Sequence, residues 1–398
     1  MSCDIGYNFK LYIIHFKMLI INLLYMAIQV LQQPSAISFA SDPIIAKVKT
    51  TLTGKTFLRV KMTCNVKAFQ SGEEISYSEE YSYNVADDGA ATFNVSNTVA
   101  TAISRCMTVD VEGTTGTQVA YAAKFTLTYK EAFLEDGVGI EQGELTSSEY
   151  KALPGSLTEF ERLTASNQDT STILGNGRIL SRKPSGEMVP KGIDLYMPAV
   201  DTVSDTISYT VAQGTASNEY SQYTGGVLVP ESIRIITSSL SPGELTVSTS
   251  RESGKKKYVV PSTPDMRHFL FLNGFGMLES VTAVTKESLS YDTQSEQYVV
   301  PKEIGFRSHT QVVGYAGQPF VSLEMSSGFV NREWAEWWVN EFCVTRRAWM
   351  MVDGRFLPVA VIPQETTDLY DRSKPGLLSV NFTVRYSFSG GTYNSFVQ

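Results

Sequence analysis

The residues with the clearest potential for chemistry are two glutamates, Glu333 and Glu336, beside three of the four tryptophans. They lie one helical turn apart, and paired carboxylates near aromatic rings are typical of sites that cleave glycosidic bonds. The apolar residues around them recur every three to four positions, which places both glutamates on the polar face of a predicted helix. We therefore expect solvated surface carboxylates. The other acidic pairs are expected in loops: Asp201 with Asp205, and Asp292 with Glu296.

The three histidines, His15, His268 and His309, lack a metal-binding spacing such as H-E-x-x-H, so the last two are expected to be structural. The sequence contains no G-x-S-x-G elbow and no phosphate-binding P-loop. Residues 137–143 approach a dinucleotide fingerprint, but their last glycine is wrongly spaced and they are expected to form a flexible joint. The sequence thus indicates no catalytic residue, no metal ligand and no cofactor site, and it predicts a protein that is not an enzyme.

The four cysteines, Cys3, Cys64, Cys106 and Cys343, are widely spaced and contain no C-x-x-C pair. Cys64 and Cys106 either pair in an oxidising compartment or, as we expect, are buried apolar side chains. Residues 255–257, three lysines in a row, are expected at a solvated hairpin tip. Residues 273–276, Asn-Gly-Phe-Gly, predict a tight turn whose glycines supply positive φ.

Twenty tyrosines make sugar stacking conceivable, above all at Tyr220 and Tyr223 in the predicted loop 217–226. Most tyrosines alternate along predicted strands, so packing is the favoured interpretation. The composition narrows the function classes further. With 398 residues, 42 % of them hydrophobic, the chain can bury two or three cores, and its net charge of −8 argues against nucleic-acid binding.

The first residues allow three interpretations. Residues 11–24 are apolar but too short and interrupted for a transmembrane helix. Residues 18–40 resemble a signal peptide with a weak cleavage site at residues 38–40. The interpretation we favour starts the mature protein at Met26, where residues 27–31 already predict an edge strand. Residues 1–25 are accordingly treated as a leader or a mis-assigned start.

Residues 26–135 predict an N-terminal β-sandwich. Apolar side chains alternate over residues 58–66, 75–85 and 119–129, and a short helix is expected over 98–105, capped by Ser96 and Asn97. Residues 136–190 are rich in glycine and proline and predict a linker or arm that holds one short helix near 157–163.

Residues 191–328 predict a central β-domain of ten short strands, over 193–197, 206–211, 227–229, 232–237, 244–249, 257–260, 269–272, 278–284, 297–300 and 317–323. Residues 329–398 predict a helix-plus-sheet unit packed on this domain. Its helix runs from Phe329 to Phe342, with Phe329 on the apolar face. A hairpin with a type I′ turn at Asp353-Gly354 and an alternating strand over 378–388 follow.

The predicted fold class is therefore mainly β, with two or three antiparallel β-sandwich-like domains and a few short helices. One of these is the Trp-rich amphipathic helix on the C-terminal sheet.

Three stretches resemble uncharacterised structural proteins of phages and prophages of gut bacteria, of the tail or baseplate type. They are residues 33–45 (QPSAISFASDPII), residues 272–280 (LNGFGMLES) and the closing pattern of Trp-bearing helix, hairpin ending near Pro358-Val359 and final alternating strand. The resemblance implies a virion protein that assembles with itself, as a homo-oligomer, and with other virion proteins. It implies no site residues, no nucleic-acid partner and no membrane association in the mature form. The alternative is a secreted or surface β-sandwich protein that binds glycans or a host protein.

Overall fold

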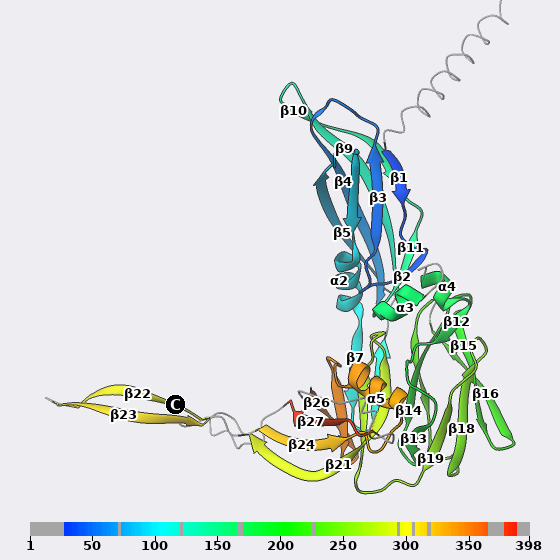
Figure 1. Cartoon of the computed structure of the whole chain (residues 1–398), viewed down its shortest axis with the longest axis vertical. Coiled ribbons are helices and arrows are strands. Elements are labelled where there is room, and N and C mark those ends of the chain that lie inside the picture. The colour runs from blue at the N-terminus through cyan, green and yellow to red at the C-terminus, as the bar shows by residue number, and fades with distance from the viewer. Residues whose placement is uncertain are drawn as a thin grey trace, which may run out of the picture. The chain divides into compact units, whose positions relative to one another are not determined.

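The computed structural model shows a chain built mainly of antiparallel strands with a few short helices (Figure 1), which confirms the predicted fold class. It describes residues 28–70, 73–119, 122–164, 170–224, 228–292, 295–304, 307–316, 320–364 and 378–387. The chain divides into two compact units. The first unit consists of Met1–Met107 and Ala120–Gly175, and the second unit consists of Thr108–Val119 and Asn176–Gln398.

The first unit contains two sheets that share one core. The smaller sheet has the order β1-β3-β6; the larger has the order β2-β11-β9-β4-β5, with β10 paired to β9. The strands are β1 (Ile28–Gln32), β2 (Ile37–Phe39), β3 (Ile45–Thr50), β4 (Thr56–Gln70), β5 (Glu73–Asn84), β6 (Ala90–Asn94), β9 (Ala123–Glu135), β10 (Val138–Thr146) and β11 (Tyr150–Leu153). Period-two patterning drives this arrangement, because β4 buries Val60, Met62, Cys64 and Val66 as predicted.

Helix α2 (Ser96–Cys106) covers this core where the sequence predicts a helix. Its cap differs from the prediction, because the N-cap residue is Val95 and no side chain caps the helix. The acceptor comes from Asn94, whose Oδ1 receives hydrogen bonds from Ser96 N (3.1 Å) and Ile44 N (3.2 Å). A short polar side chain thus acts just outside the helix, and it also ties α2 to the loop before β3.

The described residues of 136–190 form strands and helices rather than the predicted linker or arm. They contain β10, β11, α3 (Glu159–Thr164), α4 (Thr170–Leu174), β12 (Gly177–Ile179) and β13 (Glu187–Pro190). Their glycines serve turns and strands rather than a free joint: Asp136 and Gly137 both have positive φ, at 53° and 78°, in the tight turn between β9 and β10. The predicted helix near 157–163 corresponds to α3, and the division between the two units falls at Gly175.

The second unit begins with a second pair of sheets around a shared core. One sheet has the order β12-β14-β17 and the other β13-β19-β18-β15-β16. The further strands are β14 (Leu195–Asp201), β15 (Thr206–Gln213), β16 (Ala216–Tyr223), β17 (Glu231–Ile235), β18 (Gly243–Thr249) and β19 (Lys256–Val260). Two predictions fail here: the expected loop 217–226 is mostly strand β16, and Leu228 and Val229, expected in a strand, lie outside the strands.

The second unit continues as a closed six-stranded barrel with the order β20-β21-β24-β27-β26-β25. Its strands are β20 (Met266–Leu272), β21 (Leu278–Asp292), β24 (Phe320–Ser326), β25 (Ala348–Val352), β26 (Arg355–Pro363) and β27 (Asn381–Tyr386). Three of these strands come from each side of residue 329, so the barrel joins the predicted central domain to the predicted C-terminal unit. The β25–β26 turn is of type I′ as predicted, with φ of 46° at Asp353 and 75° at Gly354.

The Trp-rich helix is confirmed, but it is shorter than predicted and changes type. Helix α5 (Arg332–Trp337) begins at the N-cap Asn331, whose side chain accepts from Trp334 N at 3.0 Å, and continues as the π-helix η1 (Trp338–Phe342). Its aromatic side chains share one core with inward-facing residues of the barrel strands. Phe329 precedes the helix and is 77 % exposed, so its predicted place on the apolar face is wrong.

Two hairpins stand apart from these sheets. The hairpin of β7 (Thr108–Glu112) and β8 (Thr115–Val119) belongs to the second unit, although it interrupts the sequence of the first. Sequence reasoning missed it and predicted one strand over 119–129, whereas β9 begins at Ala123. The ribbon of β22 (Ser295–Ile304) and β23 (Arg307–Ala316) pairs with no other strand that the structure describes (Figure 1).

At the N-terminus, residues 1–25 lie outside the described part of the chain. The predicted edge strand is found as β1, which pairs only with β3 in its sheet. Phe39 and Ala40 are buried in the first unit. Cleavage of a signal peptide at residues 38–40 would therefore remove β1, β2 and part of the core.

Candidate functional site

The two glutamates of the Trp-rich helix lie on its polar face, as predicted. Glu333 is exposed, and Glu336 accepts a hydrogen bond from Arg332 Nε at 2.6 Å. Asp201 is buried at the end of β14 rather than in a free loop. It accepts from the backbone nitrogens of Val203 and Ser204, each at 2.8 Å, which marks it as a structural turn residue.

The strongest concentration of chemically active groups is a buried polar cluster in the second unit, which sequence reasoning missed. Six segments contribute to it: the loop after β12, strands β13, β19 and β21, the turn after β20, and the π-helix η1. Its members are Ser181, Arg182, Lys183, Glu187, Lys257, Asn273, Glu279 and Glu341. The cluster thus joins the sheet pair of this unit to its barrel.

Glu187 is the acceptor of two lysines. Its Oε1 lies 2.5 Å from Lys183 Nζ, and its Oε2 accepts from Lys257 Nζ. Only 2 % of the Lys183 side chain and 4 % of the Glu187 side chain are exposed, so both charges are removed from water. Lys183 also donates to the backbone carbonyl of Ser280, which provides a further partner for this buried ammonium group.

Glu279 forms the second acceptor group of the cluster. Its Oε2 accepts from Asn273 Nδ2 at 2.9 Å, and its Oε1 accepts from Ser181 Oγ and lies 3.6 Å from Lys183 Nζ. Asn273 also donates to the carbonyl of Leu180 at 2.8 Å. Each oxygen of this buried carboxylate therefore has a donor, as low-dielectric surroundings require.

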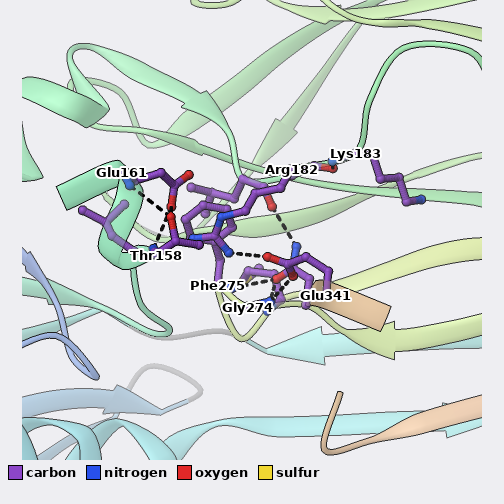
Figure 2. Close-up of polar contacts among 12 residues, drawn as sticks. Thr158, Glu161, Arg182, Lys183, Gly274, Phe275 and Glu341 are labelled. Atoms are coloured by element: carbon purple, nitrogen blue, oxygen red, sulfur yellow. Dashed lines mark hydrogen bonds and ion pairs between the residues drawn. The ribbon is translucent and has the colours of Figure 1, made fainter. Parts of the chain in front are cut away.

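Arg182 and Glu341 form the third contact (Figure 2). The guanidinium donates to Glu341 Oε1 and lies 4.0 Å from the centre of the Phe275 ring, while Glu341 Oε2 accepts from Gly274 N at 2.8 Å. One carboxylate on the π-helix thereby holds both the loop after β12 and the turn after β20.

The two glycines of the turn at residues 273–276 have different roles, whereas the sequence analysis predicted that both supply positive φ. Gly276 has a positive φ of 71°, as expected, but Gly274 does not adopt positive φ. A Cβ on Gly274 would lie 2.5 Å from Arg182 Nη1 and 2.9 Å from Glu341 Oε1. Gly274 therefore leaves the room that the ion pair occupies, and a larger residue would have to displace the two side chains.

The two central carboxyls have opposite pKa shifts. Burial alone would raise the pKa of Glu187, but the ion pairs with Lys183 and Lys257 outweigh burial and hold this pKa below its usual value. Burial raises the pKa of Glu279, and its contacts with Lys183, Ser181 and Asn273 offset this only in part. Glu187 is consequently the anionic centre of the cluster.

The histidines show no catalytic arrangement in the described part of the chain. His268 is buried in β20, where its Nδ1 lies 3.2 Å from Thr282 Oγ1. Burial, with a contribution from Lys183, lowers its pKa to about 3, so the ring is neutral at pH 7. His309 lies on β23 and its side chain is outside the description, as is the whole of His15.

The cavity described beside the cluster is too small for a substrate. The cavity beside it, lined by Ser181, Lys183, Lys255 and Lys257 among others, has a volume of about 20 Å³. That is close to the space of a single water molecule. The arrangement is suited to holding six segments in one register, because each charged group is paired and withdrawn from solvent.

One feature of the sequence, the lysine run 255–257, could have indicated this cluster. The lysine run 255–257 lies where the β18–β19 connection ends, as predicted for a hairpin, but it is not solvated throughout. Lys257 lies in β19 and is buried against Glu187, and Lys255 Nζ donates to the carbonyl of Lys183 at 2.6 Å. Lys255 and Lys256 are both exposed, and Lys256 pairs with Glu244 at 2.9 Å. Val259 and Lys257 are two residues apart on one strand, so the alternation of β19 predicts that the Lys257 side chain points inward with Val259. This pattern could have identified Lys257 as a buried residue.

The cysteines and tyrosines considered for other chemistry are also placed. Cys64, Cys106 and Cys343 are buried free thiols, and burial raises the pKa of Cys64 to about 12. Tyr220 stacks on Tyr209 with ring centres 5.3 Å apart, and Tyr223 is 69 % exposed at the end of the same strand. Within the described residues, no group of three or more metal-binding side chains is arranged to hold an ion.

Comparisons with known proteins give no family. No family model and no curated protein matches the chain. Among solved structures, a marsupial T cell receptor is similar over 75 % of this chain and 96 % of its own, with 10 % sequence identity and a TM-score of 0.17. A TM-score this low carries no argument about fold or function. Among the described helices, none has the length and apolarity needed to span a membrane.

Proposed function

We propose that the chain is a non-enzymatic structural protein of a phage or prophage virion, a tail or baseplate subunit that assembles through β-rich interfaces. The observation that carries the proposal is the ribbon β22–β23. Its two strands of ten residues each pair only with one another among the described strands. An isolated two-stranded ribbon is marginally stable in water, so a neighbouring subunit is the expected cover for its edges.

A second open edge supports the same proposal. Strand β16 pairs only with β15 in its sheet, and seven of its eight residues are exposed. Its free backbone groups suit strand addition by a neighbour. The expected partners are further copies of this chain and other virion proteins, and the expected location is the virion. The acidic charge of −8 is consistent with partners other than nucleic acid.

The oligomeric state of the purified chain tests the proposal. Light scattering and electron microscopy are expected to show a defined ring, tube or other closed oligomer. Replacing residues 295–316 with a short Gly-Ser linker should abolish the oligomer and leave the tryptophan fluorescence of the second unit unchanged. A parallel variant, Ser221→Lys in β16, tests the other edge. A wild-type chain that stays monomeric at high concentration contradicts the proposal.

The second candidate is a secreted or surface protein that binds glycans or a host protein. The observation favouring it is the stacked pair Tyr209–Tyr220 with the exposed Tyr223 nearby on β16. Any signal peptide would have to end before Ile28, where β1 begins. Tyr220→Ala and Tyr223→Ala should then lose binding on a glycan array, and a wild-type protein that binds nothing on the array removes this candidate.

A further inference from the structure

We propose that the first unit binds a neutral polyhydroxylated ligand, such as one saccharide unit, in a polar pocket between the loop after β1 and helix α3. The pocket's polar lining includes Gln32, Gln33, Ser35, Asp42, Glu159 and Arg162, and its volume is about 420 Å³. Sites for small molecules commonly have about 300–1,000 Å³. This site goes beyond the proposed assembly function, and its residues belong to the first unit, whereas β16 and the ribbon belong to the second.

The pocket has a preformed frame. Both carboxylate oxygens of Asp42 accept from Leu157 N, at 3.2 and 3.1 Å, which ties the loop after β2 to the segment before α3. The first turn of α3 is fixed by a capping box: Thr158 N donates to Glu161 Oε2 at 2.8 Å, and Glu161 N donates to Thr158 Oγ1 at 3.1 Å. Arg162 and Glu159 are therefore presented from a defined backbone.

Arg162 supplies the observation that points to a ligand. Its Nε is buried, yet it has no hydrogen-bond partner among the described residues. A buried donor without an acceptor costs about 1–3 kcal/mol, so native structures rarely leave one unpaired. Arg162 lines the pocket, and a small rotation of its side chain would present this donor to an oxygen atom of a molecule there.

The charges of the lining select the class of ligand. The lining contains one guanidinium and two carboxylates, those of Asp42 and Glu159, so an anionic ligand would meet a net negative charge. The amides of Gln32 and Gln33 each offer both a donor and an acceptor. A ligand hydroxyl can accept from Arg162 and donate to Glu159, and a polyol carries several such hydroxyls.

Saturation-transfer difference NMR on the full chain tests the site. The probes are D-glucose, D-galactose, D-mannose, N-acetyl-D-glucosamine and the anionic D-glucuronate. At least one neutral sugar should bind, and Arg162→Gln should weaken it at least tenfold. Arg59→Gln, an exposed arginine of β4 outside the pocket, serves as the matched control and should leave binding unchanged.

Thermal unfolding establishes that each variant is folded. If Arg162→Gln does not fold, Glu159→Gln replaces it, because Glu159 is exposed and carries no packing role. The proposal is overturned if no neutral sugar binds, if only glucuronate binds, or if the pocket variant binds as the wild type does. Loss of sugar binding with an intact oligomer separates this site from the assembly function.

Discussion

Single residues of the polar cluster show where close packing constrains the chain most. Gly274 leaves room for the Arg182–Glu341 pair, and Glu187 holds two lysines away from water. Burying such a network stabilises the fold only while every member keeps its partner, since an unpaired charge in the interior is strongly unfavourable. The effects of substitution at these positions are therefore expected to be large relative to the size of the chemical change.

Gly274→Ala should reduce the free energy of unfolding of the second unit by about 1–3 kcal/mol, because the added methyl group displaces the ion pair. Urea titration followed by tryptophan fluorescence measures this unit alone, since all four tryptophans lie in it. Ser217→Ala, at an exposed position of β16 in the same unit, is the control and should leave the midpoint unchanged. Equal midpoints for the two variants would contradict the geometry at Gly274.

Glu187→Gln should cost about 3–5 kcal/mol in the same titration, because two buried ammonium groups lose their shared anion. The matched change Glu244→Gln removes the exposed partner of Lys256 and should cost less than about 1 kcal/mol. A small effect at Glu187 would show that water reaches the cluster.

Glu231 provides a pH dependence with a defined sign. Burial raises its pKa from 4.5 to about 7, and the hydrogen bond with the Gln222 side chain offsets only part of this rise. The unfolded chain releases this proton at lower pH than the folded chain does, so stability is lost as the pH rises from about 4.5 to 7. Glu231→Gln should be more stable than the wild type by about 1–3 kcal/mol at about pH 8 and equal to it at about pH 4. Parallel stability profiles against pH would refute this.

At the scale of elements, the Trp-rich helix shows what periodicity can and cannot predict. Spacing of three to four residues located the helix and placed Glu333 and Glu336 on its polar face. The π-helical hydrogen bond from Cys343 N to the carbonyl of Trp338, at 2.9 Å, adds a residue to the last turn and helps bring Glu341 inward. A 3.6-residue pattern cannot reveal this shift.

Trp338→Ala should destabilise the second unit by about 3–5 kcal/mol, because the side chain is almost fully buried and stacks on Phe382 with ring centres 5.6 Å apart. Phe329→Ala is the control and should change stability by less than about 0.5 kcal/mol, because Phe329 is largely exposed. A mutant that folds normally and loses only ligand binding would make this helix a binding surface instead.

The other residues of the polar cluster could not be predicted either, because local sequence patterns do not report long-range contacts. Alternation located β4, β9 and β27, since each buries one face, and turn chemistry located Asp353-Gly354. Asn273, Glu279 and Glu341 come together only through long-range packing, with sequence separations that no local pattern encodes. Lys257 was the exception, because its inward place followed from the alternation of β19.

At the scale of the whole molecule, the β7–β8 hairpin makes the second unit discontinuous in sequence. Gln118 donates to the carbonyl of Gly276 at 2.7 Å and accepts from Leu278 N at 2.5 Å, and Tyr196 accepts from Gly116 N at 2.9 Å. The turn that carries the polar cluster is therefore supported by residues more than 150 positions earlier in the chain.

A fragment of residues 176–398 should consequently be less stable than the same unit in the full chain. Adding a peptide of residues 108–119 should raise its melting temperature in a concentration-dependent way, because binding to the folded form alone stabilises it. The control is the same peptide with Gln118→Ala. A fragment as stable as the intact unit would contradict the role of the hairpin.

The same hairpin has a consequence for how the chain is made. During synthesis residues 108–119 emerge long before β20 and β21, so the hairpin must wait while the first unit folds around its two ends. Contacts this distant in sequence close slowly. During that interval the hairpin of another chain can bind in the position that this hairpin will occupy. The result is a domain-swapped dimer, in which two chains exchange identical elements. Expression at low temperature and low chain density should therefore favour correctly closed molecules.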